Sequence, residues 1–144
     1  MKILFDTSII VAALVESHPV HKRAFSWFKQ AKAKEFDLVV ASHTLTELYA
    51  VLSTLPIKPR ISSAVAWRLI HENIETMARI VSLSPAEYSS TIKRMSELGL
   101  AGGIIYDALI AKVAQKSKVE RLLTLNIEHF RLVWPGGGKI LSTP

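Results

Sequence analysis

Short apolar runs of strand length alternate along this chain with segments whose apolar residues recur at helical spacing. Such alternation is typical of parallel strands joined by helices, because the chain must return to the same end of the sheet before each new strand. We therefore predict an α/β sandwich with a mainly parallel central sheet flanked by helices. The predicted strands cover residues 2–5, 38–41, 78–83, 121–125 and 140–142.

The segments between the strands carry recognisable helix boundaries. Ser84 is a favourable N-cap, Pro85 suits the first turn and Glu87 completes a capping box, so a helix begins here. Between the last two strands we expect a turn at residues 134–138. Further helices are predicted over residues 9–15, from His18-Pro19 onward, from a cap at Ser42 or Thr44, from Ser62 or Ser63 to about residue 75, and over residues 104–116.

The length of 144 residues fits one domain of ordinary size, over residues 1–144. The longest apolar runs, residues 9–15 and 98–106, are much shorter than the roughly 18 residues of a membrane-spanning helix, so we expect no membrane segment. Asp6 interrupts the apolar start and no small-residue cleavage site follows Val15. We interpret residues 1–15 as part of the mature fold of a cytoplasmic protein.

Composition restricts the chemistry further. The chain has no cysteine, which excludes disulfide frameworks, thiolate zinc sites and cysteine nucleophiles. Eighteen Lys and Arg residues against twelve Asp and Glu residues give a net charge of +6. This balance favours a polyanionic partner such as nucleic acid, although a solvated basic surface without such a partner fits it equally well.

Three carboxylates occupy apolar surroundings, where an uncompensated charge is costly. Asp6 directly follows the first predicted strand, Glu47 lies beside the apolar stripe of its helix, and Asp107 lies within an apolar helix. Each residue alone has a structural explanation. Asp6 could cap the next helix, Glu47 could form a capping box with Thr44, and Asp107 could cap a late-starting helix or pair with a core arginine.

Convergence of these carboxylates would have a chemical consequence. In parallel sheets, sites form beyond the carboxyl ends of the strands, where the strand order reverses, and this favours Asp6 and the residues after Leu123. Two carboxylates ~4 Å apart repel by about 4 kcal/mol at an effective dielectric of 20, so convergence requires a proton, an arginine or a metal ion. Oxygen ligands, the lack of cysteine and the positive net charge favour Mg²⁺ or Mn²⁺ acting on a phosphodiester.

The carboxylates belong to four short blocks in a fixed order. The blocks are Ile3-Leu4-Phe5-Asp6-Thr7-Ser8, Thr44-Leu45-Thr46-Glu47-Leu48, Tyr106-Asp107-Ala108-Leu109-Ile110-Ala111 and Leu122-Leu123-Thr124-Leu125-Asn126-Ile127-Glu128-His129-Phe130. Over about residues 2–135 this arrangement resembles the PIN-domain ribonucleases, most closely the VapC-type toxins of prokaryotic toxin–antitoxin pairs. The resemblance implies a PIN-like three-layer sandwich and a divalent-metal-dependent endoribonuclease in which Asp6, Glu47 and Asp107 hold Mg²⁺ or Mn²⁺.

The resemblance also implies supporting roles. The hydroxyl of Thr7 or Ser8 would orient the first carboxylate, and an activated water would attack the RNA phosphorus in line. Thr124 fits a hydroxyl at a strand end that orients the site, although an ordinary β-branched strand residue also fits. The five histidines show no metal-ligand spacing, and we assign them to caps and surface, with His43 as the one residue of interest because it lies one turn before Glu47.

The fourth block departs from the acidic pattern of the family. Asn126 stands where an aspartate is frequent; its carbonyl accepts a hydrogen bond from a metal-bound water but adds no charge, so a second metal ion would be held less firmly. Glu128 could substitute, but we expect its side chain to face solvent.

Partners follow from the resemblance alone, which implies an RNA substrate, a homodimer and a cognate antitoxin protein. Two other classes of function stay open. A PIN-like module that binds RNA or protein with weak or no catalysis is favoured by Asn126 and the basic surface, and metal affinity separates it from an enzyme. An unrelated α/β protein with the acidic residues as caps and ion pairs would keep its function in an Asp6→Asn variant.

Overall fold

The computed structural model describes residues 1–144 and contains a five-stranded sheet in which all neighbouring strands are parallel. The strand order is β3-β2-β1-β4-β5. All five predicted strands are present, so the predicted fold class is confirmed. The strands are β1 (Lys2–Phe5), β2 (Asp37–Ala41), β3 (Arg79–Val81), β4 (Arg121–Leu123) and β5 (Leu141–Ser142).

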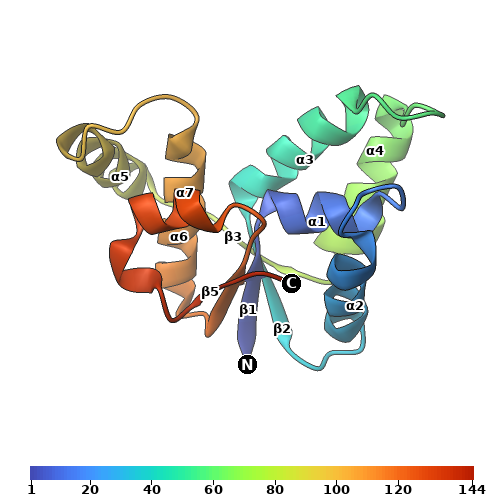
Figure 1. The fold of residues 1–144 in the computed structure, drawn as a ribbon, viewed down its shortest axis with the longest axis horizontal. Helices are drawn as coiled ribbons and strands as arrows, with labels where there is room; N and C mark the ends of the chain where they lie inside the picture. The colour runs from blue at the N-terminus through green and yellow to red at the C-terminus, as the bar shows by residue number, and fades with distance from the viewer.

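Helices cover both faces of the sheet, with α1 to α4 on one side and α5 to α7 on the other (Figure 1). They are α1 (Thr7–Leu14), α2 (His21–Lys32), α3 (Ser42–Thr54), α4 (Ser63–Ile70), α5 (Pro85–Glu97), α6 (Ile104–Ser117) and α7 (Ile127–Val133). A π-helical turn, η1 (His71–Glu75), continues α4, and a 3₁₀ turn, η2 (Pro135–Gly137), precedes β5. None of these helices combines the length and apolarity needed to cross a bilayer.

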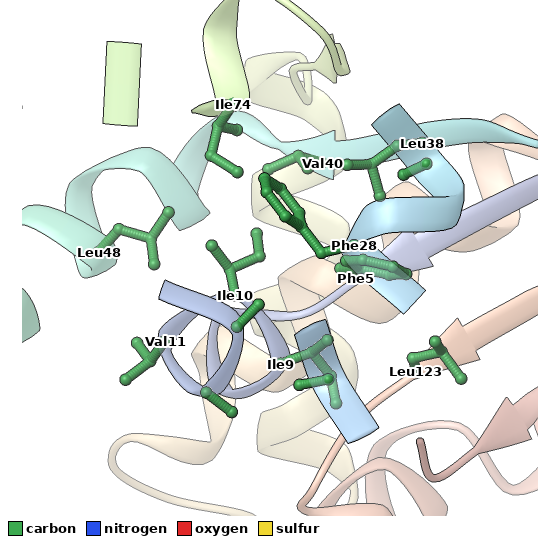
Figure 2. Close-up of a cluster of buried hydrophobic side chains, with 14 of the residues drawn as sticks. Phe5, Ile9, Ile10, Val11, Phe28, Leu38, Val40, Leu48, Ile74 and Leu123 are labelled. Carbon is green, nitrogen blue, oxygen red and sulfur yellow. The ribbon is translucent and has the colours of Figure 1, made fainter. Parts of the chain in front are cut away.

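The strands β1, β2 and β4 each contribute to two hydrophobic clusters, because side chains alternate between the faces of a sheet. Ile3 and Phe5 of β1 join the cluster beneath α1 to α4, whereas Leu4 joins the cluster beneath α5 to α7. Figure 2 shows the first cluster, in which Phe5, Phe28 of α2 and Leu48 of α3 lie among the other buried side chains. Burying one such side chain contributes about 1.5–3 kcal/mol, so both layers hold the register of β1.

The strand order reverses at β1. The chain first builds β2 and β3 on one side of β1 and then returns to build β4 and β5 on the other. Phe5 pairs with Leu123 at the last register position between β1 and β4, and the Asp6 N–H donates to the Leu123 carbonyl at 3.1 Å. The residues that follow, Asp6 and Thr124, therefore emerge side by side at the carboxyl edge, where such sheets place their sites.

The predicted cap of α3 is wrong. The helix begins at Ser42 with Ala41 in the N-cap position and no side-chain cap. The Ser42 hydroxyl is bonded to the Ser82 hydroxyl beyond β3, and Thr44 is fully buried with its Oγ1 3.4 Å from that of Thr7. Both hydroxyls bond to other elements, so neither satisfies the N–H groups of the first turn.

Two other helix boundaries differ from prediction. α2 begins at His21 because His18-Pro19 forms a turn, in which His18 Nδ1 accepts from the Val20 N–H at 3.2 Å. The short helix α7, before the predicted turn at residues 134–138, was not predicted from the sequence. Its first position follows Asn126, which provides no side-chain cap.

Candidate active site

Asp6 is the first polar residue after β1 and is 2% exposed. Its Oδ1 accepts from the Ile9 N–H at 3.1 Å, so Asp6 is also the N-cap of α1. The structural explanation of this residue and the site hypothesis are therefore compatible. Burial raises the pKa of Asp6 from 3.8 to about 6, against the hydrogen bonds that lower it.

Two hydroxyl groups hold the Asp6 carboxylate. Thr124 Oγ1 donates to Asp6 Oδ2 at 2.5 Å, and Ser8 Oγ donates to Asp6 Oδ1 at 2.6 Å. Each hydroxyl oxygen also accepts from a backbone N–H, that of Asn126 for Thr124 (2.8 Å) and that of Leu125 for Ser8 (3.0 Å). Because the hydroxyl oxygens accept these N–H groups, the hydroxyl protons are free to point at Asp6. The two hydrogen bonds that the hydroxyls donate lower the pKa of Asp6.

Glu47 projects from α3 and is half-buried. Its Oε1 accepts from Thr7 Oγ1 at 3.2 Å and lies 3.7 Å from His43 Nε2. Burial raises the pKa of Glu47, and the neighbouring His43 and Thr7 lower it. The predicted capping box with Thr44 does not form, because α3 has no side-chain cap. Thr7 therefore contacts Glu47, while Ser8 contacts Asp6.

Asp107 lies in the first turn of α6 and is also half-buried. Gly102, with φ of 77°, adopts a left-handed conformation that favours glycine just before this helix. The Asp107 Oδ2 lies 3.2 Å from His129 Nδ1 of α7, so its partner is a histidine and not a core arginine. Burial raises the pKa of Asp107, whereas His129 lowers it.

One of the three carboxylates acts on the other two. The negative charge of Asp107 raises the pKa of both Asp6 and Glu47. No Lys or Arg side chain forms an ion pair with any of the three. With the side chains oriented as in the structure, no group of three acidic or histidine side chains is arranged to hold a metal ion. The fold thus gathers uncompensated negative charge without a preformed cage.

The fourth sequence block contributes mainly backbone groups. Asn126 is exposed, and its side chain makes no hydrogen bond within the protein; its N–H donates to Thr124 and its carbonyl accepts from the N–H groups of His129 and Phe130. Glu128 is exposed and pairs with Arg131 on α7, in agreement with its predicted orientation toward solvent.

Sequence reasoning missed one contact of this site. His129 was assigned with the other histidines to caps and surface and is indeed exposed, but it also contacts Asp107, 22 positions earlier in the sequence. Its place in the fourth block, three residues after Asn126, was the available signal. Such a contact depends on how α7 packs against α6, which local spacing does not encode.

The sequence comparison agrees with this geometry. A family model described as "PIN domain" matches residues 3–133, which include every residue of the site. The chain belongs to the PIN-domain family. The family prediction from the sequence blocks is confirmed.

A curated relative refines this assignment to the VapC-like PIN ribonucleases, and solved structures share the fold. Ribonuclease VapC27 of Mycobacterium tuberculosis is 30% identical over 115 residues, which are 80% of this chain and 78% of VapC27. Mycobacterium tuberculosis VapC20, described as a "Sarcin-Ricin loop cleaving toxin", has a TM-score of 0.66 at 15% identity and covers 83% of this chain and 86% of its own. A chain of VapBC2 from Rickettsia felis, bound to a promoter DNA fragment, has a TM-score of 0.67 at 21% identity. The match covers 100% of this chain and 99% of that chain.

Proposed function

We propose that this chain is a divalent-metal-dependent endoribonuclease that hydrolyses RNA phosphodiester bonds, and that it is the toxin of a toxin–antitoxin pair. The observation that carries the proposal is the group formed by Asp6, Glu47 and Asp107, whose pKa values are all raised and which no Lys or Arg neutralises. The names of VapC27, a ribonuclease, and VapC20, a toxin, support the same activity.

The donor chemistry of the group fits Mg²⁺ or Mn²⁺, since both ions prefer carboxylate oxygens. Burial is the main cause of the raised pKa values of Asp6 and Glu47, and a cation near Asp107 would relieve the repulsion that adds to it. Glu47 and Asp107 face His43 and His129, so an ion would bind with rearrangement of at least one of these side chains.

The residues of the chain have separable roles in this proposal. Ser8 and Thr124 fix the orientation of Asp6 and favour its ionised form, and Thr7 does the same for Glu47. Asp107 supplies the third carboxylate from the other helical layer. When bound, the metal ion would supply an acidified water as nucleophile and stabilise charge on the phosphate oxygens. The carboxylates would then hold the metal ion, and the hydroxyls would orient the carboxylates.

Asn126 has a smaller role in the proposal. Its side chain is exposed at the carboxyl edge of β4 and is free to accept a hydrogen bond from a water of the site. Because it brings no charge, we propose that Asp6, Glu47 and Asp107 account for the metal affinity and that Asn126 contributes only to positioning.

We further propose that a cognate antitoxin neutralises the chain and that the chain forms a homodimer. The fold is shared with VapBC2 over the full length of both chains, which supports an antitoxin partner. Trp67 on α4 is 52% exposed and Tyr49 on α3 is 44% exposed, and contacts between α3 and α4 hold these helices together. These aromatic side chains provide apolar area for such partners.

The test is cleavage of a labelled mixed-sequence single-stranded RNA by purified protein free of antitoxin, in Mn²⁺, in Mg²⁺ and in EDTA. We expect cleavage that requires the metal ion and that is lost in Asp107→Asn. Asp37→Asn is the matched control, because Asp37 is an exposed aspartate at the opposite, amino end of β2. It should cleave as the wild type does.

Two results would contradict this proposal. Equal cleavage by wild type and Asp107→Asn would exclude Asp107 from the machinery. A folded wild type that cuts no RNA under any of the three conditions, but binds it in a salt-sensitive way, would instead indicate an RNA-binding module.

A further inference from the structure

An aromatic stack lies beside the carboxylates and has no part in the hydrolysis proposed above. The rings of His43 and Tyr106 have centroids 4.8 Å apart and planes inclined by 14°. His43 precedes Glu47 by one turn of α3, and Tyr106 directly precedes Asp107 on α6. The stack therefore joins the two helices that present two of the three carboxylates.

The length of chain between the two rings distinguishes this stack from others in the molecule. His21 stacks on Phe25, and Trp67 stacks on His71, but each of these pairs is four residues apart, where neighbouring turns of a helix bring side chains together. His43 and Tyr106 come from opposite helical layers. Their stacking is a tertiary contact at the carboxyl edge of the sheet.

The two rings differ in their surroundings. The His43 side chain is 26% exposed, and its Nε2 is buried without a hydrogen-bond partner, 3.7 Å from Glu47 Oε1. Tyr106 is 46% exposed. The imidazole is thus the inner ring, with its edge toward Glu47, and Tyr106 is the outer ring that presents aromatic surface to solvent.

We propose that Tyr106, supported by His43, is a stacking platform for one unpaired base of the RNA, next to the phosphodiester that is cut. Every base has a π face, so such a platform holds a nucleotide with little dependence on its identity. It requires that the base be unstacked from a duplex. The inference rests on the proposed ribonuclease function, since it places a base beside a phosphate at Asp107.

The first test compares steady-state cleavage of a single-stranded RNA by variants of Tyr106. Loss of one base–aromatic stack costs about 5- to 100-fold in binding, so Tyr106→Ala should raise KM or lower kcat/KM by that factor. Tyr106→Phe keeps the ring and should have the KM and kcat/KM of the wild type. Phe25→Ala is the matched control, because Phe25 is 38% exposed on α2 and stacks only within its own helix, and it should leave kcat/KM unchanged.

The second test asks whether Tyr106 acts on a base. A set of RNAs carries one abasic nucleotide at each successive position around the cleavage site. In the wild type, one abasic position should lower kcat/KM by the same factor as Tyr106→Ala. In Tyr106→Ala, that abasic nucleotide should have no further effect, because the two changes remove the same contact.

The outcomes separate this inference from the proposed function. A wild type that cleaves RNA with kcat/KM unaffected by Tyr106→Ala would overturn the platform alone, as would additive losses for the variant and every abasic position. A wild type that cleaves no RNA would overturn the ribonuclease proposal itself. Tyr106→Leu, checked with Tyr106→Ala by circular dichroism melting, keeps side-chain bulk without the ring and should show the same loss of kcat/KM.

Discussion

Asp6 and Glu87 are both carboxylates in the hydrogen-bonded start of a helix, yet their pKa values shift in opposite directions. Asp6 caps α1 by accepting the Ile9 N–H, and Glu87 accepts the Ser84 N–H in the capping box of α5. Burial raises the pKa of Asp6 to about 6. The hydrogen bond from Lys116, followed by that from the Ser84 backbone, lowers the pKa of Glu87 to about 2.

The two helix starts differ first in burial, which is nearly complete at Asp6, and second in the counter-charge that each has available. Lys116 Nζ lies 2.8 Å from Glu87 Oε1, so the start of α5 contains its own counter-charge. Asp6 has only hydroxyl and N–H donors, and the nearby Asp107 raises its pKa further. A helix start that serves only the fold is neutralised internally. At the start of α1, beyond β1, no Lys or Arg side chain pairs with Asp6, as the proposed metal site requires.

The largest stability effect should come from Asp6→Asn. Because the folded-state pKa of Asp6 is raised, ionised Asp6 opposes folding, and this cost is absent below about pH 4 and complete above about pH 6. A shift from 3.8 to about 6 corresponds to about 3 kcal/mol. Asparagine also caps helices well. At pH 7.5, Asp6→Asn should therefore increase the free energy of unfolding by an amount approaching this figure, and at pH 4 it should change the free energy of unfolding little.

Urea unfolding in EDTA at pH 4, 5, 6 and 7.5 measures this difference. Asp37→Asn, at an exposed position, provides the control and should show no such pH dependence. A wild type more stable than Asp6→Asn at every pH would break the contrast between the two helix starts.

Thr124→Val tests whether the hydroxyl that holds Asp6 is needed for activity. Valine keeps the volume but removes the hydroxyl that donates to Asp6 and accepts the Asn126 N–H. Loss of a group that orients a metal ligand typically costs about 10- to 100-fold in metal affinity or activity, and we expect a loss of this size in Mn²⁺-dependent cleavage. Thr91→Val is the control, because Thr91 is also buried but bonds within α5, and it should retain wild-type cleavage.

Ser84→Ala tests the purely structural helix start. It removes the hydroxyl that accepts the Glu87 N–H at 3.2 Å, and loss of such a cap costs about 1 kcal/mol. Thermal unfolding should show this decrease, and RNA cleavage per folded molecule should stay at the wild-type level. A selective loss of cleavage would mean that the start of α5 also serves the site.

Glu87→Gln should have the smallest effect. Glutamine still accepts the Ser84 N–H but loses the charge that pairs with Lys116. Because the folded-state pKa of Glu87 is lowered, its contribution is present above about pH 4.5 and is lost as the pH falls toward about 2. The melting temperature should decrease slightly at pH 7, by less than in Ser84→Ala, and the difference should shrink at pH 3. A difference that grows on acidification would contradict the lowered pKa.

The local signals in the sequence predicted the parts of the fold that depend on neighbouring residues. The capping box of Ser84 and Glu87 forms as predicted, because all of its groups lie within one turn. Asp6 was identified because a carboxylate at the end of an apolar strand is exceptional. Its two interpretations, cap and site, were treated as alternatives, whereas one oxygen caps α1 and the other faces Thr124.

Features that depend on tertiary packing could not be predicted. Thr44 lies three residues before Glu47, which suits a capping box, but its hydroxyl faces Thr7 of another helix. The pairing of His129 with Asp107 depends on α7, which has seven residues and no side-chain cap to signal its start. Both cases involve a polar side chain whose partner is distant in sequence.

The central claim is that the uncompensated carboxylates at the carboxyl edge of β1 bind a divalent cation. The most direct measurement is isothermal titration of Mn²⁺ into the metal-free protein, for wild type, Asp107→Asn and the control Asp37→Asn. We predict saturable binding to wild type and Asp37→Asn. Loss of an outer partner of a metal ligand typically weakens binding about 10- to 100-fold, and we predict a larger loss for Asp107→Asn. Equal binding by all three proteins, or none by the wild type, would contradict the claim.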